Sequence, residues 1–458
     1  MVFLLALQTT ASQGRNTMKK NTYEILEHIR KLIHSEDFKN TCRSNDYDFT
    51  RRCRLTFPRL LALLINLVRK SVQCELNTHL KIIDTPHISK QAFFAARKKI
   101  LPKTFIELNN KLINEFYNDN EFSKFLGYRV IAFDGSTLQL PDSSDIRAKY
   151  GACGNQYKAD EMSMARISYA YDPLNGLTLD GLMRPYAIAE RSMIYDHVSN
   201  IAPSNGADDL FIFDRGYPSV TLIYFLMAHK KNFVMRSSTA WLGEIKNILK
   251  SGKTDVIIQI TPRMIKIKNR AEFRNRFPGI CLKTPMKIRV IIIELPTGEM
   301  EILITSLLDN NEFEYKIFKD LYRMRWGAEE NYKFHKIRIE IENFSGVSTH
   351  AVEQDFYATL FTANIRALLA REAQAEMEDI HPKKELQHNY KINQNVALGT
   401  LKDKIIDILL DPKSNIKEFC ERIKQLMKKS TVSVRPGRKY ERRWKNVRKF
   451  PMNERRAL

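Results

Sequence analysis

Short apolar runs separated by turn residues fill residues 128–236, and they constrain the fold more than any other feature of the sequence. Two of the runs flank the turn Asp172-Pro173-Leu174-Asn175-Gly176, which is typical of a β-hairpin. An apolar helical stretch at 220–229 separates the last two runs. The expected strands are residues 128–140, 164–171, 177–188, 209–213 and 232–236. This order of strands and one helix predicts an α/β domain with a mixed sheet flanked by helices.

The regions on either side have different patterns. Residues 22–120 have apolar residues at helical spacing, whereas residues 240–308 contain three further strand-like runs at 255–261, 287–295 and 300–306. Helical patterns return at 311–341, 355–377 and 398–429. We therefore divide the chain into a helical N-terminal domain, a first core part, a β-rich insertion, a second core part and a helical C-terminal region with a basic tail. Their bounds are 18–122, 123–239, 240–310, 311–378 and 379–458.

The charge of the chain points to a polyanionic partner. Lys and Arg number 74 against 52 Asp and Glu, for a net charge of +22, which favours nucleic acid or an anionic membrane surface. Half of that excess lies in residues 421–458, where Arg435 and Arg438 are followed by Tyr440, Trp444 and Phe450. Such a tail suits phosphate contact and stacking on bases, although a solvated tail has the same composition.

A second basic segment lies near the N-terminus. Residues 86–89 end one helix and supply Ser89 as the N-cap of the next, which carries Lys90, Arg97 and Lys98. A short helix, a turn and a basic helix outline a helix-turn-helix DNA reader that would use these three residues. A helical bundle with a solvated basic face fits the pattern equally well.

Several function classes are disfavoured. The six cysteines include no CxxC pair and the ten histidines form no HExxH motif, so a zinc site and a disulfide framework are not expected. The apolar start at residues 2–7 is too short to cross a bilayer, which takes about 20 residues. We expect a soluble, cytoplasmic protein that does not act in a membrane.

Two aspartates are placed for metal chemistry. Asp134 ends one expected central strand and Asp214 ends another. Carboxylates at neighbouring strand ends can converge, and such oxygen ligands suit Mg²⁺ in phosphoryl transfer. Either aspartate alone is equally consistent with an ordinary turn or cap.

A third acidic residue lies in the helical pattern of residues 321–340. There Tyr322, Arg325, Glu329 and Lys336 are spaced Y-x2-R-x3-E-x6-K. On one continuous helix, steps of three, four and seven place all four side chains on a single face. A surface helix with an ion pair between Arg325 and Glu329 is the alternative interpretation.

These residues resemble those of DDE transposases, and the Y-R-E-K spacing is similar to the signature of the insertion-sequence-four family. The segments that carry the resemblance are FDGSTLQLPD at 133–142 and FDRGYPS at 213–219, and the segments at 89–102, 169–181 and 435–443 are also similar. The resemblance implies an RNase H-like catalytic core interrupted by the β-rich insertion. It also implies that Asp134, Asp214 and Glu329 bind two Mg²⁺ ions, for which Mn²⁺ substitutes, and that Tyr322, Arg325 and Lys336 hold phosphates.

The expected function is that of an insertion-sequence transposase in a prokaryotic cell, associated with the nucleoid. A homodimer would bind double-stranded DNA, both element ends and target, through Lys90, Arg97, Lys98, Arg435 and Arg438, and would perform cut-and-paste transposition by strand cleavage and strand transfer. Two alternatives stay open: an RNase H-fold nuclease that joins nothing, and a catalytically silent or repurposed DNA-binding protein.

Overall fold

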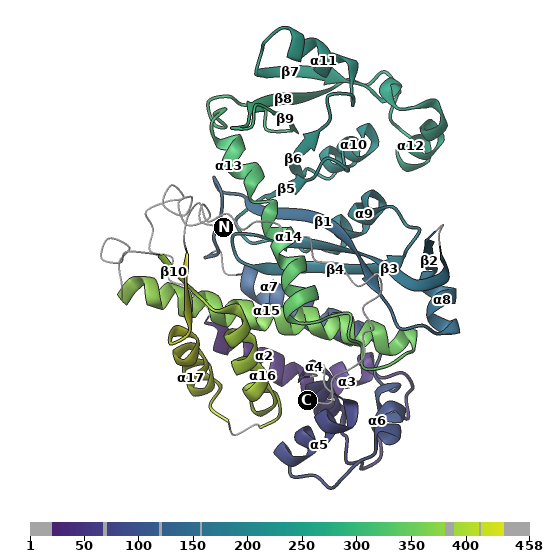
Figure 1. Ribbon diagram of the computed structural model, residues 1–458, viewed down its shortest axis with the longest axis vertical. Coiled ribbons are helices and arrows are strands. Elements are labelled where there is room, and N and C mark those ends of the chain that lie inside the picture. Colours follow the sequence, from purple (N-terminus) through teal and green to yellow (C-terminus); the bar gives the residue numbers. More distant parts are fainter. Residues whose placement is uncertain are drawn as a thin grey trace.

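The computed structural model describes residues 21–66, 71–118, 121–155, 158–380, 389–411 and 414–434. Within them, a nine-stranded sheet has the order β2-β3-β1-β5-β6-β9-β8-β7, and β4 pairs with β3 outside that path (Figure 1). Its strands are β1 Arg129–Gln139, β2 Ala152–Asn155, β3 Lys158–Asp172, β4 Leu177–Pro185, β5 Asp209–Phe213, β6 Asn232–Ser237, β7 Asp255–Ile260, β8 Met286–Glu294 and β9 Met300–Thr305. The β1–β5 and β5–β6 pairs are parallel and the other pairs are antiparallel. The predicted mixed α/β sheet is therefore confirmed.

The central parallel strands are apolar on both faces because helices cover both. Every residue of β5 is buried. Phe211 and Phe213 pack on one face with residues of α9 (Glu190–Asn200) and α10 (Val220–Ala228), whereas Leu210 and Ile212 pack on the other with α13 (Ile317–Arg323). Strands enclosed in this way have continuous apolar sequences rather than alternating ones, which is the pattern of residues 209–213.

The predicted hairpin is formed by β3 and β4. Asp172 at the end of β3 closes the turn, since its Oδ1 accepts hydrogen bonds from the main-chain N–H groups of Leu174 at 2.8 Å and Asn175 at 3.0 Å. Gly176 has φ of +73°, a left-handed conformation that costs glycine little. The long strand β3 then pairs with β1 along one edge and with β4 along the other.

The three strands predicted for residues 240–310 are present as β7, β8 and β9. They do not form a separate body, because β9 pairs with the core strand β6 and Val234 lies opposite Thr305. The Thr305 hydroxyl donates a hydrogen bond of 2.7 Å to the Phe233 carbonyl across this junction. The insertion thus extends the core sheet at one end, accompanied by α11 (Gly243–Lys250), α12 (Arg270–Arg276) and two short 3-10 turns at Pro262–Met264 and Ile267–Asn269.

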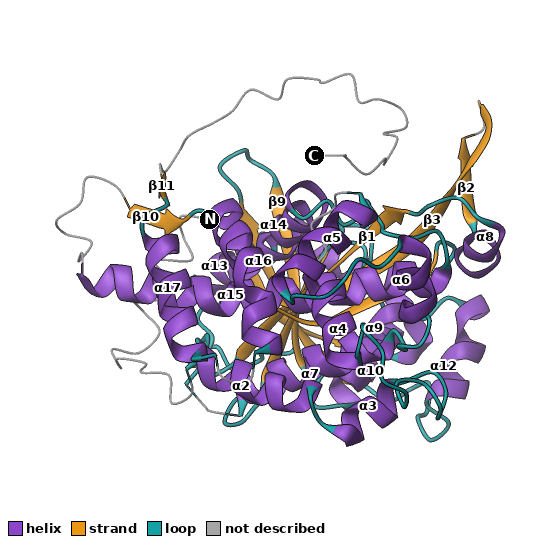
Figure 2. Cartoon of the chain, turned by 90° about the horizontal axis from the view of Figure 1, so that it is seen from below, coloured by secondary structure: helices purple, strands orange, loops and turns teal. Residues whose placement is uncertain are grey.

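Helices from both ends of the chain form a layer at the end of the molecule opposite the insertion, and Figure 2 shows them in front of the strands. In Figure 1, α15 (Thr349–Ile380) lies between this layer and the sheet. The C-terminal helix α16 packs against α2 and α4, and α17 packs against α2. The other elements of this part are α2 Thr22–Ile33, α3 Glu36–Cys42, α4 Phe57–Asn66, α5 Val72–Ile82, α6 Lys90–Arg97, α7 Lys103–Tyr117, α16 Gln394–Leu410, α17 Ile416–Lys428, β10 Asn389–Ile392 and β11 Thr431–Val434.

Local capping explains where several of these helices begin. Asn21 and Glu24 form a reciprocal capping box at the start of α2. Ser89 accepts a hydrogen bond from the Ala92 N–H at 3.3 Å and begins α6, as predicted. None of the helices within the described ranges combines the length and the apolar character that crossing a bilayer requires.

Candidate functional site

Asp134 and Asp214 lie side by side on neighbouring parallel strands. The β1–β5 ladder ends with Phe133 opposite Phe213, so the two aspartates occupy the next position on each strand. Asp214 follows the last residue of β5, as predicted. The prediction that Asp134 ends its strand is wrong: β1 continues to Gln139 because β3 pairs with it beyond the end of β5, with Asp134 opposite Tyr169.

The helix predicted for residues 321–340 is not continuous. It consists of α13, which ends at Arg323, α14 (Trp326–Lys333) and a π-helical turn at Phe334–Arg338. The chain bends at Met324 and Arg325, where i→i+3 hydrogen bonds replace the α-helical pattern. A single helical face therefore does not explain how the four residues of the Y-R-E-K set are arranged.

Three of the four nevertheless converge on the strand carboxylates. The Tyr322 hydroxyl donates a hydrogen bond of 3.2 Å to Asp214 Oδ1. Arg325 Nη1 lies 2.7 Å from Glu329 Oε1, and its Nε lies 4.0 Å from Asp214 Oδ1. Arg325 is only 4% exposed, so its guanidinium fills the space between Asp214 and Glu329.

Lys336 lies apart from this cluster. Its Nζ donates a hydrogen bond of 2.5 Å to the main-chain carbonyl of Thr137, further along β1. Burial lowers the pKa of Lys336, although Glu342 opposes that effect. The π-helical turn directs this side chain along β1 instead of toward Asp214.

The surroundings of Asp134 disfavour a negative charge on its carboxyl group. Burial raises the pKa of Asp134 to about 6, and the charges of Glu329 and Glu190 add to that effect. Arg325 and a 3.0 Å hydrogen bond from the Gly135 N–H act in the opposite direction. Burial also disfavours the charge on Arg325, but Tyr322, Glu329 and Asp214 outweigh it and raise the pKa of Arg325. The pocket would therefore be stabilised by an additional cation.

Two residues that are not among the predicted site residues, Tyr332 and Glu190, lie against the main chain at Asp134 and Gly135. Tyr332 donates a hydrogen bond of 2.7 Å to the main-chain carbonyl of Asp134 and stacks on Tyr169, with ring centroids 4.4 Å apart. It lies one helical turn after Glu329, so it connects the helix of one carboxylate to the strand of another. On the other side of β1, Glu190 forms a 2.9 Å ion pair with Arg166.

Glu190 lies directly against the main chain beside Asp134. A Cβ atom added to Gly135 would come within 2.3 Å of Glu190 Cδ, so a larger residue there would displace the Glu190 side chain. The spacing of Tyr332 from Glu329 and the Asp-Gly dipeptide are the signals in the sequence that point to these contacts.

Divalent cations suit the chemistry of this site but need a rearrangement. Asp134, Asp214 and Glu329 supply the hard carboxylate oxygens that Mg²⁺ and Mn²⁺ prefer. Across the described ranges, however, no group of three or more His, Cys, Asp or Glu side chains is arranged to hold a metal ion. One of the three carboxylates, Glu329, forms an ion pair with Arg325.

The residues predicted to bind DNA outside this cluster have different environments. Lys90 and Lys98 are exposed on and just after α6. Arg435 and Arg438 lie outside the described residues.

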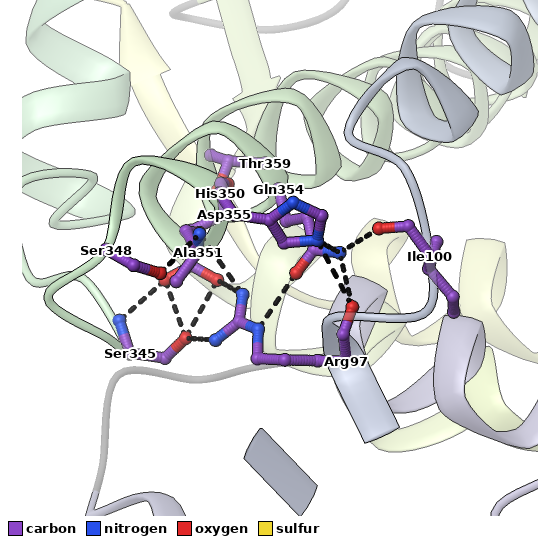
Figure 3. Close-up of polar contacts among 9 residues, drawn as sticks. All are labelled: Arg97, Ile100, Ser345, Ser348, His350, Ala351, Gln354, Asp355 and Thr359. Carbon is purple, nitrogen blue, oxygen red and sulfur yellow. Dashed lines mark hydrogen bonds and ion pairs between the residues drawn. The ribbon is translucent and has the colours of Figure 1, made fainter. Parts of the chain in front are cut away.

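Arg97 is only 2% exposed, so the prediction that it contacts DNA is wrong. Its guanidinium donates to Gln354 at 2.8 Å, to Ser345 at 2.6 Å, to the Ala351 carbonyl at 3.1 Å and to Asp355 at 3.0 Å (Figure 3). It therefore joins α6 to the start of α15.

Comparison with known proteins gives a family match in sequence and weak similarity to solved structures. A family model described as "Transposase DDE domain" matches residues 125–365, a range that includes Asp134, Asp214 and Glu329. No curated protein matches the sequence. Among solved structures, the chain is similar to the piggyBac transposase in its synaptic complex with hairpin DNA, with 9% identity, 88% of this chain and 85% of that chain covered, and a TM-score of 0.44. At that score the structural similarity supports no further conclusion.

Proposed function

The chain belongs to the transposase DDE domain family, and on that premise we propose that it is an insertion-sequence transposase that cuts and joins DNA in cut-and-paste transposition. The observation that carries the proposal is the arrangement of three carboxylates from separate elements around Arg325. Asp134 on β1 and Asp214 after β5 are adjacent in register, and Glu329 on α14 shares Arg325 with Asp214. All three lie within the range matched by the family model.

We assign metal binding to Asp134, Asp214 and Glu329, with two Mg²⁺ or Mn²⁺ ions as the bound group. Such ions would activate the attacking oxygen and stabilise the leaving oxygen at a phosphodiester. Tyr332 holds the main chain of Asp134, so it would keep that carboxylate aligned with Glu329. Tyr322, Arg325 and Lys336 would bind the phosphates next to the scissile bond.

DNA binding is proposed for two basic regions. Lys90 and Lys98 present charge from α6 on the helical layer, and we include the basic tail with Arg435 and Arg438 in the same role. Two copies of the chain would bring the two element ends together before strand transfer. Arg97 has no place in this surface, because its charge is neutralised inside the protein.

The proposal is tested with a plasmid that carries the gene's native flanking DNA. In Mg²⁺ or Mn²⁺, the wild-type protein should cut at the ends of the element, and Glu329→Gln should not. Glu330→Gln is the matched control, since Glu330 is on the same helix but pairs with Lys333 at the surface. Equal cleavage by Glu329→Gln and Glu330→Gln would contradict the assignment of Glu329.

A second assay follows the fate of the cut ends. Joining of the ends to a target plasmid supports a transposase, whereas cleavage without joining indicates a nuclease. Binding of the flanking DNA with no cleavage by the wild-type protein would instead favour a silent DNA-binding protein.

A further inference from the structure

Arg325 is a buried cation that contacts two of the three carboxylates of the site. It lies 2.7 Å from Glu329 and 4.0 Å from Asp214, and its charge also lowers the pKa of Asp134. A divalent ion that binds Glu329 would have to take the place of this guanidinium contact. Two cations cannot share Glu329 at such short range without strong repulsion, so the guanidinium and the ion compete for this carboxylate.

The contacts that hold Arg325 are incomplete. Its Nε has no hydrogen-bond partner within the described structure, although the atom is buried, and 4.0 Å from Asp214 is an ion-pair distance but not a hydrogen bond. The rings of Trp326 and Tyr322 also lie near it, at 5.0 and 5.8 Å from the guanidinium carbon. A buried donor without an acceptor is unfavourable, and an incoming phosphate could supply that acceptor.

The site is also open enough for an exchange of partners. The side chains of Asp214 and Glu329 remain 41% and 30% exposed, and Trp326 beside Arg325 is 55% exposed. A phosphate of DNA could therefore approach from the solvent side. Guanidinium groups bind phosphate oxygens in two-point geometry, which would satisfy the free N–H group of Arg325.

We propose that Arg325 is a resident counter-ion that competes with the divalent metal for Glu329 and moves to a DNA phosphate when an element end binds. The inference rests on the proposed function of the three carboxylates. When DNA binds, the Arg325 guanidinium leaves Glu329 and no longer competes with the metal. DNA and metal therefore each strengthen the binding of the other. Free protein would then bind metal weakly, and an unbound transposase would cut little DNA.

The first test measures Mn²⁺ binding to DNA-free protein by electron paramagnetic resonance of the free ion. Binding to the site is defined as the part that Asp134→Asn abolishes. Arg325→Gln should bind Mn²⁺ more tightly than wild type, by about 5- to 150-fold, the usual range for coupled sites. Lys333→Gln is the matched control, because it removes the same charge from the same helix at the surface pair with Glu330, and it should leave the affinity unchanged.

The outcomes separate this inference from the proposed function. If Arg325→Gln binds Mn²⁺ no more tightly than Lys333→Gln while the wild-type protein cuts DNA in a metal-dependent way, the competition is refuted and the proposed function stands. If the wild-type protein shows neither site-specific Mn²⁺ binding nor cleavage, both fail.

A second measurement needs no variant and so does not depend on how Arg325→Gln folds. The affinity of the wild-type protein for Mn²⁺ is compared with and without a duplex taken from the flanking DNA. The duplex should tighten Mn²⁺ binding to the wild-type protein, and it should have little effect on Arg325→Gln. An affinity that the duplex leaves unchanged in the wild-type protein would overturn the proposed coupling.

Discussion

Arg97 and Arg325 are both buried and both face acidic side chains, yet their surroundings differ. Arg97 donates to four acceptors and pairs with Asp355, which is also buried and fixed by hydrogen bonds from Ser345. Arg325 has one close partner, an unsatisfied Nε, and carboxylate partners that are partly exposed. Arg97 thus holds two segments of the fold together, whereas Arg325 still has an N–H group that can donate a hydrogen bond to a ligand.

The two arginines are examples of two kinds of buried ion pair. A fully satisfied pair stabilises one structure and changes little with ligands, but removing one partner strands a buried charge. An incompletely satisfied pair next to a carboxylate with a raised pKa is typical of a site that awaits a ligand. The following predictions test this contrast, beginning with the largest expected effect.

Glu329→Gln should reduce DNA cleavage by about 10⁴-fold or more, the scale seen when a residue that acts within a catalytic unit is removed. The free energy of unfolding should change little, because Glu329 is partly exposed. Cleavage rates and urea unfolding of the same preparation provide the two measurements. If Glu329→Gln instead unfolded easily but still cut DNA, Glu329 would have a structural role like that of Asp355, not a catalytic one.

Asp355→Ala should lower the free energy of unfolding by about 3–5 kcal/mol, because Arg97 would remain buried without its counter-ion. Arg325→Ala should lower it by about 1 kcal/mol or less, since the carboxylates it leaves can be hydrated. Urea unfolding of both variants gives the comparison. Equal losses would mean that the two arginines have the same structural role.

Asp134→Asn should stabilise the metal-free protein in a pH-dependent way. The pKa of Asp134 is raised to about 6 in the folded protein from an ordinary value of 3.8, so the folded state binds the proton more tightly than the unfolded state. Well below pH 4 the Asp134 carboxyl is protonated in both the folded and the unfolded state, so it does not lower the free energy of unfolding. As the pH rises through 6, the buried charge destabilises the wild-type protein.

The free energy of unfolding of Asp134→Asn should therefore exceed that of the wild-type protein by almost nothing at pH 4 and by about 3 kcal/mol above pH 7. Each unit of pKa shift corresponds to about 1.36 kcal/mol. Unfolding free energies measured at several pH values test this. A constant difference between the two proteins would show that the carboxyl does not titrate in this window.

Lys98→Ala should have the smallest effect, a weaker affinity for DNA at unchanged stability. Losing one phosphate contact should reduce the slope of log affinity against log salt by about 0.9. Lys98 adjoins Arg97 but is exposed, so the two residues separate surface charge from buried charge. Binding measured across a salt series, with a slope equal to that of wild type, would exclude Lys98 from the DNA contact.

Much of the fold follows from short-range patterns. The alternation and turn residues of 164–188 predict the β3–β4 hairpin, and Ser89 predicts where α6 begins, because both depend on neighbours within a few residues. The apolar run at 209–213 predicts a strand but not that its neighbours would be β1 and β6. The segment at 321–340 was predicted as helix, but its division into α13, α14 and a π-helical turn was not, because contacts with the sheet override the local preference.

The site shows the same division. Their place at expected strand ends singled out Asp134 and Asp214, and regular spacing singled out the Y-R-E-K set that includes Glu329. Both signals are local and can be recognised without a structure. The sequence could not separate the buried Arg97 from the exposed Lys98, since the partner that buries Arg97 lies 258 residues away. Nor could it give a role to Tyr332, whose contact with Asp134 spans 198 residues.

Local patterns thus predict most of the helices and strands, and composition gives the charge. Which groups come together, and which arginine keeps an unsatisfied donor, depend on the tertiary fold. Helix and strand preferences arise from nearby residues, whereas burial and the pairing of charges depend on segments that folding brings together from distant parts of the chain.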